Sequence, residues 1–193
     1  MKAILMSIRS PHTCNILNLI KLWEIRKKFP KDYVGWVYIY CTKGGDMVCY
    51  RPNFDGYACV PNLYGNEYFN GKVVARFWCD KVEEINIYGE VVTHFSTEKI
   101  KEDELLKKSC LSYAEMFDYF DNCENGYAIH ITKLEIFDKP KELSEFRKPM
   151  EYTKYCNRNC SNCDYAGFNN KTRKWEFECS LTCAPQSWCY VEV

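Results

Sequence analysis

The apolar residues of this chain fall into runs that predict mostly β-strands. Runs rich in Val, Ile, Tyr and Trp are typical of strands, and turn-forming Gly, Asn and Pro separate them. The stretch 46–70 is rich in Gly, Asn, Pro and Tyr, and we predict a long loop there, or a loop with short pieces of structure. The predicted strands cover residues 3–8, 23–29, 34–41, 71–79 with a continuation towards Ile87, 127–137 and 187–193.

Two helices are predicted between these strands. Ser10 followed by Pro11 combines a hydroxyl N-cap with proline at the first helical position, and apolar residues then recur at helical spacing. This pattern predicts a helix over about 11–20. A second helix, over about 112–121, begins with a Ser-x-x-Glu capping box ahead of Met and Phe residues.

The order of these elements indicates an α+β fold. Strands dominate, helices are few, and the connections are too irregular for a repeated βαβ pattern. Closure into a small β-barrel with a few flanking helices would remove the exposed sheet edges. At 193 residues, the chain 1–193 is expected to form a single domain.

Composition narrows the functional classes. Lys and Arg together number 26, as do Asp and Glu, so a basic protein that coats nucleic acid by phosphate neutralisation alone is not supported. A local basic patch is still compatible with this balance. No apolar run reaches the roughly 18 residues that a membrane-spanning helix needs, and the N-terminal run is too short for a signal peptide. We therefore expect a cytoplasmic protein with no membrane partner.

Three charged residues near the first helix form a candidate site. Lys21 closes the predicted helix, and Glu24 and Arg26 lie two apart on the strand that follows, so their side chains should share one face. A guanidinium can bind phosphate or carboxylate, and a carboxylate can accept from amides or hydroxyls. The alternative is a solvated run of charges, because three lysines follow closely, at Lys27, Lys28 and Lys31.

The segment Lys21-Leu-Trp-Glu24-Ile-Arg26 resembles the GxKxxExR signature of ASCH domains, which belong to the PUA-like superfamily of small β-barrels. The chain departs from the signature at its glycine, where it has Leu19. The resemblance to phage and bacterial ASCH proteins extends beyond this motif, with 46–70 and 150–183 as looser insertions. The similar stretches are the opening strand and helix and residues 34–43, 126–131, 139–146 and 185–192.

This resemblance implies a function. ASCH and PUA-like domains are thought to bind RNA or modified nucleotides in a cleft beside the barrel. By that resemblance Lys21, Glu24 and Arg26 line the cleft, with Ser187 and Trp188 as neighbours. RNA or a modified nucleotide is therefore the expected partner.

Two other functions stay open. Some ASCH relatives resemble small hydrolases that act on acylated cytidine or cut RNA. In such an enzyme Lys21 would activate a group or transfer a proton, and Glu24 would be its acid/base partner. The amidohydrolase relatives usually carry a hydroxyl residue at the position of Glu24, which weakens the amidohydrolase version of this function. The third function is a phage-type protein-interaction inhibitor of a host defence system, acting in the host cytoplasm.

The chain has thirteen cysteines, and we expect them to be reduced because no signal peptide is evident. Cys189, on the final strand, is expected in the core. Seven others are scattered and are predicted to be small buried hydrophobes: Cys14, Cys41, Cys49, Cys59, Cys79, Cys110 and Cys123.

The remaining cysteines predict a structural zinc site in a cysteine-rich insertion at about 150–184. Two short cysteine pairs separated by a loop match the spacing of a four-thiolate site, which leaves no open position for catalysis. Buried free thiols and disulfides are the alternatives. The predicted ligands are Cys160, Cys163, Cys179 and Cys183, with Cys156 as an alternative ligand.

Other candidate residues carry less weight. His130 lies among apolar residues of a predicted strand and is more typical of a core or cleft residue than of a ligand. Arg76 and Trp78 share one strand face and could stack on bases, although most aromatic residues here are more simply explained as core.

Overall fold

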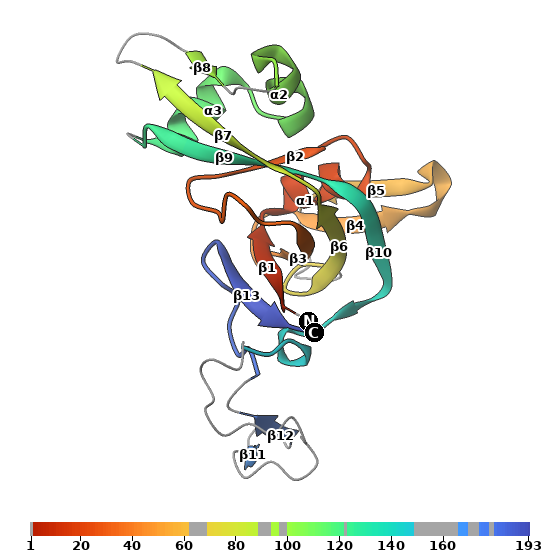
Figure 1. The fold of residues 1–193 in the computed structure, drawn as a ribbon. Helices are drawn as coiled ribbons and strands as arrows, with labels where there is room; N and C mark the ends of the chain where they lie inside the picture. The colour runs from red at the N-terminus through yellow and green to blue at the C-terminus, as the bar shows by residue number, and fades with distance from the viewer. Residues whose placement is uncertain are drawn as a thin grey trace.

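A five-stranded and a four-stranded β-sheet form the framework of the protein (Figure 1). The computed structural model describes residues 2–61, 69–88, 94–96, 100–121, 123–148, 166–169, 174–177 and 180–193. The helices are α1 (Ser10–Leu17), α2 (Glu102–Ser109) and α3 (Tyr113–Phe120), with short 3-10 turns at Pro52–Phe54 and Leu143–Glu145. The strands are β1 (Lys2–Ile8), β2 (Trp23–Arg26), β3 (Gly35–Cys41), β4 (Met47–Arg51), β5 (Gly56–Val60), β6 (Val73–Cys79), β7 (Val82–Tyr88), β8 (His94–Ser96), β9 (Asn125–His130), β10 (Thr132–Lys141), β11 (Ala166–Asn169), β12 (Lys174–Phe177) and β13 (Trp188–Glu192).

The five-stranded sheet has the order β10-β6-β3-β1-β13 and holds the main core. β1 runs parallel to β3 and antiparallel to β13, which brings the two chain termini side by side (Figure 1). β1 is buried on both faces, because Ile4 and Met6 pack in one apolar cluster and Leu5 packs in another. Burial on both faces explains why this strand is a continuous apolar run.

The four-stranded sheet has the order β2-β9-β7-β8, and α2 and α3 lie against it (Figure 1). Trp23 and Ile25 of β2 pack with Leu105 of α2 and Phe120 of α3. A Cβ atom at Gly126 of β9 would lie only 2.0 Å from the Phe120 ring. Gly126 therefore lets the end of α3 lie directly over the sheet.

The predicted α+β class is confirmed, but the predicted closed barrel is not. The chain passes from the five-stranded to the four-stranded sheet between β6 and β7, and it returns between β9 and β10. Lys133, just after the second crossing, has a left-handed φ of 44°. Strands that switch sheets make the corners of packed sheets, and here the ladders of the described strands do not close into a ring.

Several predicted elements differ from those observed. α2 was not predicted, and the long strand predicted over 127–137 is divided into β9 and β10. The β4–β5 hairpin within residues 46–70 agrees with the predicted loop that contains short pieces of structure. The capping box of α3 is present as predicted. The predicted N-cap of α1 is wrong, because Ser10 is its first helical residue and its Oγ accepts from Asn70 Nδ2 at 2.8 Å.

The described part of the predicted insertion includes an antiparallel hairpin of β11 and β12. Four of the five predicted zinc ligands lie outside the described residues, so the zinc site stays a prediction; they are Cys156, Cys160, Cys163 and Cys179. The seven scattered cysteines and Cys189 are free thiols. Cys14, Cys41 and Cys79 are buried as predicted, whereas the others are only partly buried: Cys49, Cys59, Cys110, Cys123 and Cys189. Among the helices of the described ranges, none is long and apolar enough to cross a membrane.

Candidate ligand-binding site

The candidate site begins where α1 ends. The Leu19 N–H donates to Ile16 O and the Ile20 N–H donates to Asn15 O, both at 2.9 Å, which is the hydrogen-bond pattern of a Schellman cap. Leu19 has a φ of 57° in the left-handed region that favours glycine. A leucine with a side chain that is 62% exposed thus occupies a backbone conformation that glycine adopts without strain.

Lys21 is buried between this helix exit and the end of α2. Its backbone N–H donates to Asn15 O at 3.0 Å. Its side chain is only 2% exposed, and Nζ donates to the backbone carbonyl of Ser109 at 2.5 Å. Ser109 is the last residue of α2, where unpaired carbonyls and the negative end of the helix dipole favour a cation. Through this hydrogen bond, Lys21 links the end of α2 to the segment that leads into β2.

Glu24 and Arg26 point to the same face of β2, as the alternation predicts. Arg26 Nη1 lies 2.5 Å from Glu24 Oε1, and Lys21 Nζ lies 3.4 Å from Glu24 Oε2. Arg26 Nη2 also donates to the backbone carbonyl of Ser7 in β1 at 2.7 Å. Glu24 is 3% exposed, so a solvated charge run is the wrong interpretation of these three residues.

The two cations keep the buried carboxylate ionised. Burial alone would raise the pKa of Glu24, but the charges of Arg26 and Lys21 outweigh it and hold the pKa below its ordinary value. The three side chains together carry one net positive charge. At neutral pH the site is therefore cationic overall but contains a strong hydrogen-bond acceptor.

His12 is a titratable residue on which the charges of these three side chains act, and the sequence analysis did not single it out. It lies in the first turn of α1, and its pKa is lowered, chiefly by burial and then by the charge of Lys21. The charges of Glu24 and Arg26 also act on it, as does that of Glu115 in α3. No sequence spacing links His12 to residues 21–26, so the sequence alone does not indicate this electrostatic interaction.

Three buried polar atoms of this cluster have no hydrogen-bond partner among the described residues. They are His12 Nδ1, Glu24 Oε2 and Arg26 Nε. Glu24 Oε2 lies close enough to Lys21 for an ion pair, but the contact lacks hydrogen-bond geometry. Buried polar groups nearly always have partners, so three unpaired atoms in one cluster need an explanation.

The other two predicted site residues, Ser187 and Trp188, lie just before and at the start of β13, which pairs with β1. Ser187 is exposed, and its carbonyl accepts from the Ser7 N–H at 2.9 Å, next to the carbonyl that binds Arg26. The indole of Trp188 donates to Lys28 O at 2.6 Å and packs edge-on against Phe29 at a centroid distance of 5.6 Å. The structure thus places Ser187 near the cluster, whereas the N–H of Trp188 already has a partner.

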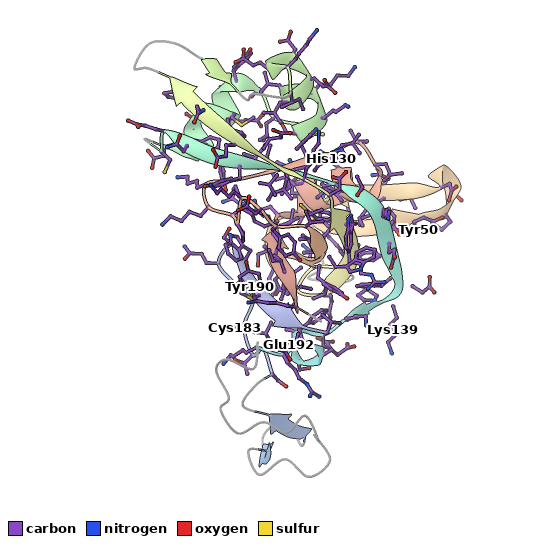
Figure 2. The ribbon with its side chains drawn as sticks, viewed as in Figure 1. Tyr50, His130, Lys139, Cys183, Tyr190 and Glu192 are labelled. Atoms are coloured by element: carbon purple, nitrogen blue, oxygen red, sulfur yellow. The ribbon has the colours of Figure 1, made fainter. Side chains whose placement is uncertain are left out.

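His130, another candidate of the sequence analysis, lies opposite Trp23 in the pairing of β2 with β9. The His130 ring lies 4.6 Å from that of Trp23, and its Nδ1 is 2.7 Å from Asp80 Oδ1. His130 lies where β9 meets β10, far from Cys183, which precedes β13 (Figure 2).

Arg76 and Trp78 belong to a face of the five-stranded sheet. The Arg76 guanidinium lies 4.1 Å from the centre of the Trp36 ring, and Arg76 Nη2 is 2.6 Å from Glu135 Oε2. Trp36 and Trp78 meet edge to face at 5.4 Å.

Comparison with known proteins gives structural neighbours only. No family model matches the chain, and no curated protein matches it. The ASCH structure from Zymomonas mobilis is 15% identical, with a TM-score of 0.46 and coverage of 73% of each chain. A tyrosine-to-phenylalanine mutant of that protein is also 15% identical, with a TM-score of 0.47 and coverage of 74% of this chain and 77% of that chain.

Proposed function

We propose that this chain is an ASCH domain of the PUA-like superfamily that binds RNA or a nucleotide, including a modified one, at Lys21, Glu24 and Arg26. The observation that carries the proposal is a buried charged cluster with unused hydrogen-bonding capacity. A charged cluster that serves only the fold is expected to have all its polar atoms paired. The resemblance of the segment Lys21–Arg26 to the ASCH signature supports the same site.

The electrostatics of the cluster favour binding over hydrolysis. The lowered pKa of Glu24 keeps it ionised at neutral pH, so it has no proton to give as a general acid. A lowered pKa also makes the carboxylate a weaker base than one whose pKa lies near 7. Lys21 Nζ already contacts both Ser109 O and Glu24. An ionised Glu24 is instead well suited to accept hydrogen bonds from a ligand.

A binding experiment tests this proposal. We expect a labelled single-stranded RNA to bind the wild-type chain with an affinity that falls as salt is raised, and to bind Lys21→Met at least about tenfold more weakly. Arg76→Met is the matched control, because it removes a cation that lies on another sheet. Affinity that is independent of salt, or equal for Lys21→Met and wild type at retained folding, would refute the nucleic-acid function. Turnover of acetylcytidine or RNA would instead support the hydrolase.

We also propose a structural zinc ion bound by Cys160, Cys163, Cys179 and Cys183. The hairpin of β11 and β12 supports it, because the register pairs Ala166 with Phe177. In sequence, Cys163 precedes Ala166 by three residues and Cys179 follows Phe177 by two. Cys183 contributes an exposed free thiol. Such a clip would stabilise a segment with little apolar content.

Elemental analysis of the purified protein tests the zinc proposal. We expect about one zinc per chain, lost when Cys160 and Cys163 are both changed to Ser and kept in the control Cys189→Ser. Protein without zinc refutes the site. Loss of zinc in Cys156→Ser with retention in Cys160→Ser would instead assign Cys156 as a ligand.

A further inference from the structure

β13 forms one edge of the five-stranded sheet, beside β1 (Figure 1). The carbonyl of Ser187 accepts a hydrogen bond from β1, whereas Glu192 exchanges hydrogen bonds with Arg147 on the other side of the strand. Successive residues of an antiparallel strand direct their backbone groups to opposite sides. Trp188 and Tyr190 therefore direct their N–H and C=O groups away from β1, as Glu192 does. In the described ranges, no strand pairs with β13 at these two positions.

The opposite edge of the same sheet has the features that prevent a further strand from adding. β10 contains Pro140 and three lysines, at Lys133, Lys139 and Lys141, and register shifts interrupt its pairing with β6. Proline, lysine and bulges are the usual protection of edge strands. β13 has the sequence WCYVE, without proline or lysine, and its pairing with β1 is regular. The sheet therefore protects one edge and leaves the other able to pair.

The chain's own sequence is poorly suited to extend the bridge between Arg147 and Glu192. The bridge is antiparallel, so the residue opposite Tyr190 in the same register would be Pro149. Proline has no N–H to donate to the outward carbonyl.

Aromatic rings and ammonium groups flank the free part of this edge. Trp188 packs edge-on against Phe29, and the Tyr190 ring lies 5.6 Å from that of Trp188. Lys2 Nζ lies 4.3 Å from the centre of the Tyr190 ring. The Trp188 indole donates to the carbonyl of Lys28, which places Lys28 next to the edge.

Basic residues outnumber acidic ones around this edge. Lys31 belongs to the same loop as Lys28, two residues before Tyr33, whose ring lies 6.5 Å from that of Tyr190. An acidic partner would therefore be attracted, the more so at low salt. The basic residues are Lys2, Lys28, Lys31 and Arg147, and the acidic ones are Asp32 and Glu192.

We propose that β13 is a docking edge for an extended, acidic segment of a partner protein, which adds to the sheet as an antiparallel strand beside Trp188 and Tyr190. The backbone of the added strand pairs with the outward N–H and C=O groups, which is the β-augmentation mode of peptide recognition. Its acidic side chains lie on the face of Trp188 and Tyr190, close to the lysines. Its other side chains lie on the face of Cys189, which packs against an apolar cluster. The inference concerns protein recognition and goes beyond the proposed nucleotide binding.

A labelled peptide of alternating glutamate and valine is the probe. We expect it to bind the full chain in fluorescence polarisation. A peptide with lysine in place of glutamate should bind at least about tenfold more weakly, and salt should reduce the difference. Hydrogen exchange should be fast at the amides of Trp188 and Tyr190 in the free chain and at least about tenfold slower with the acidic peptide. Absence of binding, or equal binding of both peptides, overturns the inference.

A pair of variants isolates the backbone contact. Tyr190→Pro and Tyr190→Ala both remove the ring, but only proline removes the outward N–H, which β1 does not use. Tyr190→Pro should bind the acidic peptide at least about tenfold more weakly than Tyr190→Ala, with unchanged far-UV circular dichroism. Equal affinities of the two variants overturn strand addition.

A second pair of variants tests the location. Changing Lys28 and Lys31 together to Glu should weaken binding of the acidic peptide at least about tenfold. Changing Lys139 and Lys141 together to Glu is the matched control, because it makes the same charge change on β10 at the opposite edge. An equal loss in the control overturns the assignment to β13.

The remaining outcomes identify other occupants of the edge, and each overturns the proposal. Slow exchange at Tyr190 in a free monomeric chain means that the chain itself covers the edge. Slow exchange that depends on protein concentration, with a dimer in sedimentation velocity, assigns the edge to a second copy. Loss of RNA binding in Tyr190→Pro but not in Tyr190→Ala assigns it to nucleic acid. The proposed function is tested separately, by Lys21→Met.

Discussion

Two arginine–glutamate pairs in this protein have nearly the same geometry and very different surroundings. Arg26 and Glu24 approach to 2.5 Å with side chains 12% and 3% exposed, whereas Arg76 and Glu135 approach to 2.6 Å with side chains 30% and 47% exposed. Exposed pairs contribute about 0–1 kcal/mol, but burial of a pair costs several kcal/mol of desolvation per ion. The distance between the charges therefore does not determine the contribution of a pair to stability, whereas its burial does.

The two arginines also differ in how many of their side-chain nitrogens have partners. Arg76 lies over the Trp36 ring and donates to both Glu135 and the Tyr38 hydroxyl, so its Nε and both terminal nitrogens have partners. Arg26 leaves Nε unpaired in a buried position. The buried pair thus leaves one guanidinium nitrogen unpaired, whereas the exposed pair leaves none.

The largest expected effect comes from removing one cation of each pair. Arg26→Met leaves the Glu24 carboxylate buried with one partner fewer, and we expect a loss of about 3–5 kcal/mol in the free energy of unfolding. Arg76→Met should cost about 1 kcal/mol, from an exposed pair and a cation–π contact. Urea denaturation of both variants measures the difference, and equal losses would remove the distinction between the two regions.

The next effect is the pH dependence that the buried pair gives to stability. The folded-state pKa of Glu24 lies below its ordinary value of 4.5. Its stabilisation is therefore fully present above about pH 4.5 and is lost as the pH falls through the folded pKa. Between the two values the slope approaches 1.4 kcal/mol per pH unit for one proton.

Glu24→Gln should reduce the dependence of the free energy of unfolding on pH, measured by urea denaturation between pH 3 and pH 7. The variant should be less stable than wild type at pH 7, and the gap should narrow as the pH falls. A gap that stays constant over this range would mean that Glu24 does not carry the pH dependence.

A smaller effect on stability is expected at Leu19, just after the end of α1. Leu19 has a φ of 57° and a side chain that is 62% exposed, so it carries backbone strain with little burial in return. Leu19→Gly should raise the free energy of unfolding by about 1 kcal/mol, because glycine adopts this conformation without strain. Thermal melting checks it, with Ile20→Gly as a control that should not stabilise. A destabilised Leu19→Gly would show that the leucine side chain contributes contacts.

The smallest effect is expected for the carboxylate of the exposed pair. Glu135→Gln should change the free energy of unfolding by less than about 1 kcal/mol, since Arg76 keeps its contact with Trp36. Urea denaturation at low and high salt measures it, and salt should reduce the difference further. A loss as large as that of Arg26→Met would place the two pairs in the same class.

Local patterns in the sequence predicted much of the fold. The alternation over residues 23–26 predicted β2, and the capping box predicted α3. α2 escaped prediction because it offers few apolar residues, although its first turn is acidic and its last turn is basic. That charge pattern complements the helix dipole and could have identified it.

The sequence by itself determined that Glu24 and Arg26 share a face, because alternation along a strand is a local property. Only the tertiary structure decided that this face is buried. Lys21 Nζ donates to the carbonyl of Ser109, which lies 88 residues further along the chain, and Arg26 donates to the carbonyl of Ser7, which lies 19 residues earlier. The burial of this site depends on groups that are distant in sequence, and so do its pKa values and its unpaired atoms. No local pattern of residues predicts which distant groups lie there.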